Sequence, residues 1–168
     1  AELREKGISI PILVLGEIDA EQCATVLQYG LTQAVPSLAM AHCLNQAAER
    51  TGQKAKVHLK LDTGMGRIGF RNLEELQAAA IELKDMRNLS IEGVFTHFAS
   101  ADEGDPSFTR EQIKKFNRMI QLLRENGLDL NTIHASNSAG IFNFPDANYN
   151  LVRGGISMYG YYPSRDTM

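Results

Sequence analysis

The chain has no tryptophan, only two cysteines (Cys23 and Cys43) and no long apolar segment. Each cysteine falls inside a helical pattern, so we expect buried thiols rather than a disulfide. No apolar run approaches the roughly 20 residues that cross a bilayer, and no signal peptide is visible, which favours the cytoplasm and no membrane partner. The net charge is −3 with acids and bases interspersed, so we expect no nucleic-acid partner.

What the chain does contain is a regular alternation of short apolar runs and segments of helical periodicity. The 168 residues are 43% hydrophobic, enough for a sizeable core. Capping-box spacing at Asn72 and Glu75, and a cap followed by proline at Asp105, mark helix starts. The predicted strands are residues 12–15, 32–35, 57–62, 91–98, 132–135 and 151–159, and the predicted helices are 20–29, 37–51, 73–87, 107–126 and 138–143.

This alternation predicts an α/β fold with a parallel sheet. In the run 57–62, side-chain alternation puts His58, Lys60 and Asp62 on one face of the strand. A polar face on a central strand fits a barrel interior better than an open, doubly wound sheet. A closed (β/α)8 TIM barrel needs eight strands and about 250 residues. We therefore predict a single, incomplete domain over 1–168, a partial TIM barrel corresponding roughly to strands 3 to 8.

Both ends of the chain read as cut. Residues 1–7 are typical of the last turns of a helix that ends at a glycine, and Met168 comes soon after the last predicted strand. We expect a piece of a longer protein that lacks the N-terminal strands of the barrel.

The chemistry of parallel α/β folds gathers at the carboxyl ends of strands. That rule nominates residues 62–67, His97, 137–138 and 153–156. The glycine-rich loop at 63–67 could equally be a plain connection, since it is not a P-loop or dinucleotide fingerprint. Lys60 is harder to dismiss, because an ammonium inside a barrel must find an anion or lose its charge.

The histidines have a simpler alternative interpretation as hydrogen-bonded core residues. Taken alone, His97 favours that interpretation, and His42, His58 and His134 favour it more strongly. No two histidines or cysteines have metal-ligand spacing, so no metal site is predicted.

Two loops near the end of the chain suggest a phosphate site. Residues 136–140 follow a strand and open a short helix, and 153–156 form a second glycine-containing loop. Each loop alone could be a helix cap or a turn. A phosphate site built from the last two strand–helix loops is, however, a recurrent feature of barrels. The pair therefore predicts a barrel enzyme that binds a phosphorylated cofactor or substrate.

The whole chain resembles the barrel domain of bacterial alanine racemases, which use pyridoxal 5'-phosphate (PLP). Residues 60–70, Lys-Leu-Asp-Thr-Gly-Met-Gly-Arg-Ile-Gly-Phe, resemble the central motif of that family. Matching stretches occur in family order at 11–16, 58–69, 96–102, 136–139 and 152–160.

The resemblance implies a role for each matching residue. Arg153 would hydrogen-bond the pyridine nitrogen of the cofactor, and His97 would hold Arg153 in orientation. Arg67 would contact the phenolic oxygen of the cofactor and the substrate, so that Arg67 and His97 would support catalysis. Lys60 matches a position that many members carry as a carbamate, an anion that would pair with Arg67.

The phosphate of the cofactor would be held by Ser138 with the backbone N–H groups of Gly155 and Ile156, and Asn137 would bind the cofactor beside them. The resemblance also implies that both proton-transfer bases lie outside this chain. The Schiff-base lysine belongs to the first strand, and a tyrosine comes from a C-terminal β-domain, across a homodimer.

The implied function of the parent protein is interconversion of L- and D-alanine through an aldimine of PLP, supplying D-alanine for peptidoglycan. One alternative is a racemase of the same fold for serine, lysine or a broader range of amino acids. A barrel decarboxylase fits the motifs less well. For the isolated chain, we expect a non-catalytic fragment that depends on the missing segments.

Overall fold

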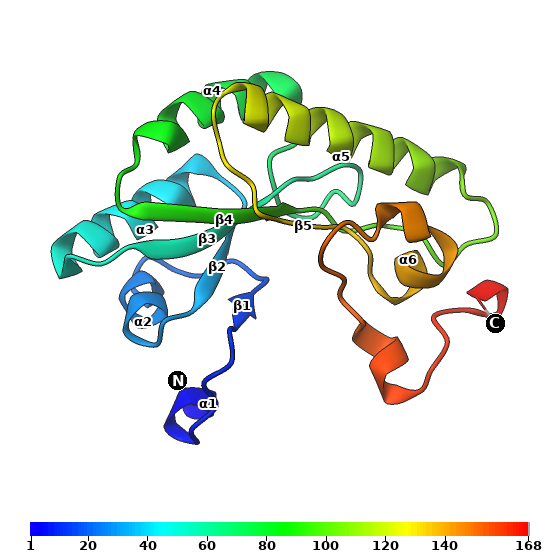
Figure 1. The fold of residues 1–168 in the computed structure, drawn as a ribbon, viewed down its shortest axis with the longest axis horizontal. Helices are drawn as coiled ribbons and strands as arrows, with labels where there is room; N and C mark the ends of the chain where they lie inside the picture. Colours follow the sequence, from blue (N-terminus) through cyan, green and yellow to red (C-terminus); the bar gives the residue numbers. More distant parts are fainter. Residues whose placement is uncertain (168) are drawn as a thin grey trace.

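The computed structural model describes residues 1–167. Five parallel strands lie in the order in which they occur along the chain, and they form an open, curved sheet that resembles half of a barrel (Figure 1). The strands are β1 (Leu13–Val14), β2 (Thr32–Val35), β3 (Ala55–Lys60), β4 (Leu89–Phe95) and β5 (Thr132–His134). The predicted α/β fold with a parallel sheet is confirmed, whereas the numbering of the strands within a complete barrel stays a prediction.

Each strand is connected to the next by a helix that covers the convex face of the sheet. In Figure 1, α4 and α5 lie above the sheet, and both chain ends extend below it. The helices are α1 (Glu2–Glu5), α2 (Gln22–Gln28), α3 (Leu38–Thr51), α4 (Leu73–Asp85), α5 (Ser107–Glu125) and α6 (Ser138–Asn143), with 3-10 turns η1 (Pro145–Ala147), η2 (Gly155–Tyr159) and η3 (Arg165–Thr167).

The predicted helix starts are stabilised by side-chain caps. The Asn72 side chain accepts a hydrogen bond from the Glu75 backbone N–H at 2.8 Å, and the Glu75 carboxylate accepts one from the Arg71 N–H at 3.0 Å. The Asp105 carboxylate accepts from the Ser107 N–H at 2.9 Å, just before α5.

The hydrophobic core lies between the sheet and the helices. Leu59 of β3, Leu44 of α3 and Phe116 of α5 are fully buried in it. The opposite side chains of the central strands, such as His58 and Lys60, are also buried, but on the concave face. This division follows from the alternation of side chains along a strand, and it gives the concave face a polar lining.

The predicted sixth strand at 151–159 is wrong. Among the described residues, this segment pairs with the sheet only through a single bridge between Leu151 and His134, and residues 155–159 form η2. Gly155 has a φ of +40°, a conformation outside the extended range of a strand. The apolar character of the run, with Met158 and Tyr159 about four-fifths exposed, misled the periodicity argument.

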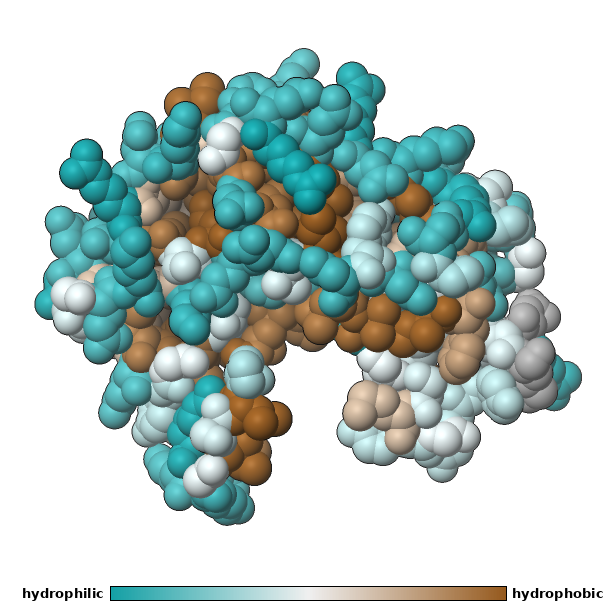
Figure 2. All heavy atoms as spheres, in the orientation of Figure 1, coloured by the Kyte–Doolittle hydropathy of each residue, from teal (hydrophilic) through white to brown (hydrophobic). Residues whose placement is uncertain are grey.

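The molecule has the shape of an arch (Figure 2). Figure 2 shows a hollow between the α1 end and the C-terminal segment, with apolar residues along its roof. Among residues 1–167, no helix is both long and apolar enough to cross a membrane.

Candidate functional site

The site begins with a row of side chains that crosses the concave face of the sheet. The strand register places Lys60 opposite Phe95, and Phe95 opposite His134. Side chains in register on neighbouring parallel strands point to the same side. The Phe95 ring stacks on the His134 ring at 4.7 Å, and the Lys60 ammonium lies 5.6 Å from the centre of the Phe95 ring.

Arg153 lies over the same row and joins the ends of β4 and β5. Its guanidinium donates from Nη2 to the carbonyls of Thr96 and Ala135, each at 2.8 Å, and it lies 5.5 Å from the Phe95 ring centre. Burial lowers the pKa of Arg153 to about 10, so the group keeps its charge near neutral pH. The two carbonyls fix the guanidinium relative to β4 and β5.

Two histidines contact Arg153 through ring nitrogens. His134 Nδ1 lies 2.8 Å from Nη1, and His97 Nδ1 lies 3.3 Å from Nη2. Arginine has only donors, so both nitrogens must accept, and His97 shares one of the two Nη2 hydrogens with a carbonyl. Burial, followed by the charge of Arg153, lowers the pKa of His134 to about 2 and that of His97 to about 4. Both rings are therefore neutral near pH 7.

These contacts also fix the tautomers of His134 and of His58, which His134 contacts in turn. Because His134 Nδ1 accepts from Arg153, His134 Nε2 carries the proton and donates to His58 Nδ1 at 2.9 Å. His58 then carries its own proton on Nε2. The two buried, neutral rings of His58 and His134 thus form a hydrogen-bonded series that ends at Arg153.

Lys60 is only 3% exposed. Its Nζ donates to the Leu61 carbonyl at 2.9 Å. Burial lowers the pKa of Lys60 to about 8, with further lowering by Arg153 and Arg67 that Asp62 opposes. About a tenth of the Lys60 side chains is therefore an uncharged amine at pH 7, far more than for an exposed lysine.

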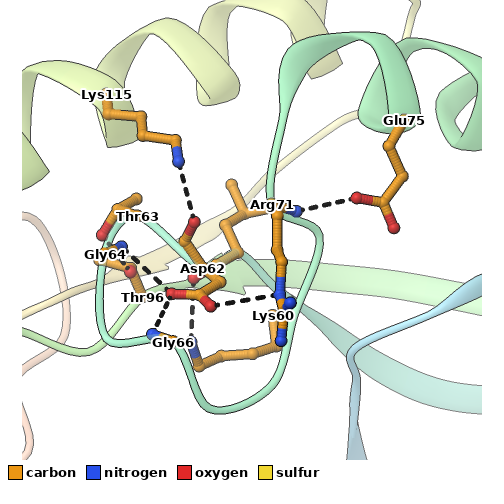
Figure 3. Close-up of polar contacts among 10 residues, drawn as sticks. Lys60, Asp62, Thr63, Gly64, Gly66, Arg71, Glu75, Thr96 and Lys115 are labelled. Carbon is orange, nitrogen blue, oxygen red and sulfur yellow. Dashed lines mark hydrogen bonds and ion pairs between the residues drawn. The ribbon is translucent and has the colours of Figure 1, made fainter.

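The loop after β3 is organised around the buried carboxylate of Asp62 (Figure 3). Oδ1 accepts from the backbone N–H groups of Gly64 at 3.1 Å and Gly66 at 3.0 Å, and Oδ2 lies 3.7 Å from Arg71 Nε. Burial would raise the pKa of the Asp62 carboxyl, but the two N–H groups, together with the charges of Lys60 and Arg71, outweigh it and hold the pKa below its usual value. Asp62 stays charged and closes the loop.

Two neighbours complete the fold of this loop. The Lys115 ammonium of α5 donates to the Asp62 carbonyl at 3.2 Å. Gly69 has a φ of +120°, and a Cβ there would lie 2.7 Å from the Lys60 carbonyl oxygen. Only glycine fits that position. The loop carries Arg67, which is exposed and makes no hydrogen bond or ion pair with the rest of residues 1–167.

The loops predicted to bind a phosphate lie where α6 and η2 meet. Asn137 caps α6 by accepting from the Gly140 N–H at 3.0 Å, and the Ser138 hydroxyl donates to the Gly154 carbonyl at 2.5 Å. A Cβ on Gly155 would approach the Ser138 hydroxyl at 3.0 Å. The hydrogen bonds found within the described chain do not use the N–H groups of Gly155 and Ile156.

These elements enclose a cavity of about 410 Å³. Most of the predicted site residues line it, namely His97, Asn137, Ser138, Arg153, Gly155 and Ile156. Two are absent from its wall: Lys60 lies beneath Phe95, and Arg67 lies on the exposed loop. Their positive charges nevertheless contribute to the lowered pKa of His97, after burial and the charge of Arg153. A larger hollow of about 710 Å³ lies between α4 and α5, and none of the predicted residues line it.

Sequence reasoning missed the part that His58 and His134 have in the site. Both are buried, as the core interpretation expects. What it did not expect is their chain of contacts to Arg153. The available signal was position: His134 lies two residues before Ser136, at a strand end.

Comparison with known proteins assigns the family. The sequence profile of the family described as "Alanine racemase, N-terminal domain" matches residues 1–163. The chain is 44% identical over 165 residues to alanine racemase of Desulforamulus reducens and 46% identical over 165 residues to that of Carboxydothermus hydrogenoformans. These alignments cover 98% of this chain and 45% and 44% of the two relatives. The chain thus spans less than half the length of the curated relatives.

Solved structures agree with this assignment. Alanine racemase of Clostridium difficile 630 in complex with cycloserine superposes with a TM-score of 0.95 at 43% identity, over 99% of this chain and 46% of that chain. Alanine racemase of Bacillus anthracis with bound L-Ala-P superposes with a TM-score of 0.85 at 34% identity, over 98% of this chain and 42% of that chain. The chain therefore belongs to the alanine racemase N-terminal domain family.

Proposed function

We propose that the protein to which this chain belongs interconverts L- and D-alanine with pyridoxal 5'-phosphate, and that this chain supplies the wall that binds the cofactor. The observation that carries the proposal is the partly buried Arg153. It is fixed by two backbone carbonyls and two neutral histidines, yet it lines an open cavity.

The donors of this cavity suit such a cofactor. Among the described residues, neither Arg153 Nε–H nor the second hydrogen on Nη1 has an acceptor. At the other end, the N–H groups of Gly155 and Ile156 are unused beside the Ser138 hydroxyl. A phosphate accepts from backbone N–H and hydroxyl donors of this kind, and a ring nitrogen accepts from a guanidinium.

PLP, when bound, supplies an electron-accepting ring that makes the α-proton of an amino acid more acidic. The residues of this chain bind and orient. Arg153 would hold the ring nitrogen, and since its pKa is about 10, it would keep its proton and leave that nitrogen largely unprotonated. We propose that His97 holds Arg153 in orientation and that Arg67 reaches the phenolic oxygen and the substrate. Ser138 and the backbone N–H groups of Gly155 and Ile156 would hold the phosphate, and Asn137 would bind the cofactor beside them.

Neither proton-transfer base is assigned to this chain, so we expect the isolated chain to be inactive. For the intact protein, we propose a homodimer, a location in the cytoplasm and supply of D-alanine for peptidoglycan. These finer statements rest on the resemblance to the family.

Lys60 is proposed as the site of a carbamate. Its pKa of about 8 leaves an uncharged amine, which is the form that adds to carbon dioxide. The ammonium first gives one proton to solvent. The amine nitrogen then bonds to the carbon of CO2 and loses a second proton to solvent, so that overall a cation becomes an anion that can pair with Arg67. Incubation of the full-length protein with 13C-bicarbonate should give a carbamate carbon signal that is missing in Lys60→Met. Clear electron density for a bare amine beside Arg67 would contradict this modification.

The main test is formation of D-alanine from L-alanine by the full-length protein, with and without added PLP, followed by chiral chromatography. Racemisation that depends on the cofactor is the expected result. Arg153→Gln should reduce it strongly, whereas Arg118→Gln, on the outer surface of α5, should not. Cofactor binding without alanine racemisation would overturn the substrate assignment and direct the search to serine, lysine or a broader range of amino acids.

A further inference from the structure

The two cysteines of the chain lie far apart in sequence but meet between two helices. Cys23 is on α2 and Cys43 is on α3, and their Sγ atoms are 2.7 Å apart. This is closer than the normal contact of two non-bonded sulfur atoms. A disulfide bond measures about 2.05 Å, so only a small shift of either side chain would bring the sulfurs to bonding distance.

The two thiols differ in access. Cys23 is 1% exposed and faces the core, whereas Cys43 is partly exposed. The Cys43 side chain lines a surface hollow of about 410 Å³ with Ile18, Ala20 and Met40. A small molecule can therefore reach Cys43 from solvent, whereas Cys23 is almost closed to solvent and lies next to Cys43.

We propose that Cys23 and Cys43 are a site of reversible oxidative modification, at which exchange with a small disulfide such as oxidised glutathione links α2 to α3. The site is independent of the proposed racemase function, because neither cysteine lines the cavity of Arg153.

The exchange runs in two balanced steps. The Cys43 thiolate attacks one sulfur of oxidised glutathione, a protein–glutathione bond forms, and one glutathione thiolate leaves. Cys23 then gives its proton to solvent and attacks the Cys43 sulfur, and the second glutathione leaves. Two protein thiols are oxidised by two electrons, and one small disulfide is reduced to two thiols.

The second step is expected to be the slower one. Burial, with the neighbouring Cys43 thiol, raises the pKa of Cys23 to about 12, so its thiolate is scarce. The short distance between the sulfurs offsets this, because the attack is intramolecular. The order of attack predicts that glutathione accumulates on Cys43 when Cys23 is removed.

The test uses the full-length protein, folded and reduced, then incubated with oxidised glutathione and quenched with acid. Trypsin leaves both cysteines in one peptide, residues 7–50, because no lysine or arginine lies between Lys6 and Arg50. The expected product is this peptide lighter by the mass of two hydrogen atoms. Cleavage at Met40, which separates the cysteines, should then release two fragments only after reduction.

Two variants make the order of events visible. Cys23→Ser should keep glutathione on Cys43, and Cys43→Ser should take up none in residues 7–50. The oxidised wild type should also unfold at a higher temperature than the reduced form, because a cross-link restricts the unfolded chain. The proposal is overturned if folded wild type keeps two alkylatable thiols in this peptide after prolonged exposure, or if glutathione stays on Cys43 without being displaced.

Discussion

Among single residues, Arg153 has the most demanding environment. It is a partly buried cation with no carboxylate partner among the described residues, held by the carbonyls of Thr96 and Ala135 and by ring nitrogens. These acceptors are neutral and do not cancel its charge, and they leave Nε–H and one hydrogen on Nη1 unused, so both charge and donors remain available to a ligand. His134 is central to this arrangement because it links Arg153 to His58 and stacks on Phe95.

Replacement of His134 by phenylalanine should destabilise the protein. The ring stack would persist, but the buried Arg153 Nη1 and His58 Nδ1 would each lose a partner, at a cost of about 1–3 kcal/mol for each unpaired group. The measurement is urea unfolding of the full-length protein. His134→Asn, whose side-chain oxygen can replace the Nδ1 acceptor, is the matched control and should lose less. Equal stability of the phenylalanine variant and the wild type would argue against a structural role for the chain of histidines.

The same histidines predict how stability depends on pH. An unfolded histidine binds a proton below about pH 6.5, whereas folded His97 and His134 bind one only near pH 4 and pH 2. The unfolded state therefore binds more protons, and stability falls as the pH drops below about 6.5, by up to about 1.4 kcal/mol per pH unit for each such histidine.

Unfolding free energies of the full-length protein at a series of pH values test this. His134→Asn should flatten the dependence between about pH 6.5 and pH 4. The exposed His42→Asn should keep the wild-type dependence, because the buried histidines remain. An unchanged slope in His134→Asn would mean that His134 is not held neutral in the fold.

Among structural elements, the loop between β3 and α4 has the tightest internal organisation. Its conformation depends on the Asp62 carboxylate, which holds the N–H groups of Gly64 and Gly66 and approaches Arg71. The loop in turn positions Arg67 at the edge of the site. Asp62 thus acts on the site through the backbone.

Asp62→Ala should loosen this loop. We expect faster tryptic cleavage after Arg67 in the folded full-length protein, because the N–H groups of the loop would lose their common acceptor. Glu103→Ala, at an exposed turn, is the control. Asp62→Asn keeps one oxygen acceptor and should have a smaller effect. Unchanged cleavage in Asp62→Ala would show that other contacts hold the loop.

The strand β4 contains a second point at which the backbone is closely packed. A Cβ on Gly93 would lie 2.5 Å from the Thr132 carbonyl oxygen and 2.9 Å from the His58 ring. Gly93→Ala should therefore push β5 away and cost about 1–3 kcal/mol of stability. Thermal unfolding measures this, with Gly16→Ala as the control, since no atom lies within 4 Å of a Cβ there. A neutral Gly93→Ala would mean that β5 shifts without penalty.

Sequence patterns predicted the elements well where periodicity and caps agreed. The strands at Thr32–Val35 and Thr132–His134 and the helices from α3 to α5 lie close to their predicted bounds. The contact between His58 and His134 could not be predicted in this way. The register of β3 against β4 shifts between Val57 and His58, so that His58 pairs with Gly93 and Glu92 has no partner on β3. An alternation rule assumes no bulge and cannot place one.

At the scale of the whole molecule, the sheet is open and both of its edge strands are short. β1 has two residues and β5 has three, and the apolar side chains of Leu151, Val152, Ile156 and Met158 are exposed beyond the last strand. The predicted grouping of site loops followed from a general property of parallel sheets. The conformation of residues 151–159 could not be predicted in the same way, because an exposed apolar segment and a buried strand can have the same composition.

This architecture predicts the behaviour of the isolated chain. Expressed alone as residues 1–168, it should aggregate or unfold without a sharp transition, because unpaired edges and exposed apolar residues favour association. Urea unfolding followed by circular dichroism, with light scattering on the same samples, measures both. A cooperative transition of a monomer would contradict this expectation.

The hydrogen bonds from Arg153 to the carbonyls of Thr96 and Ala135 have an evolutionary consequence. These carbonyls follow β4 and β5, whose spacing is set by a core that includes Val94, Ile133 and Phe116 of α5. A substitution in that core which moves one strand against the other would turn the guanidinium, even if no residue of the cavity changed. Purifying selection on the site should therefore extend into the packing behind the sheet, and lineages that diverge there should do so by paired, volume-compensating replacements.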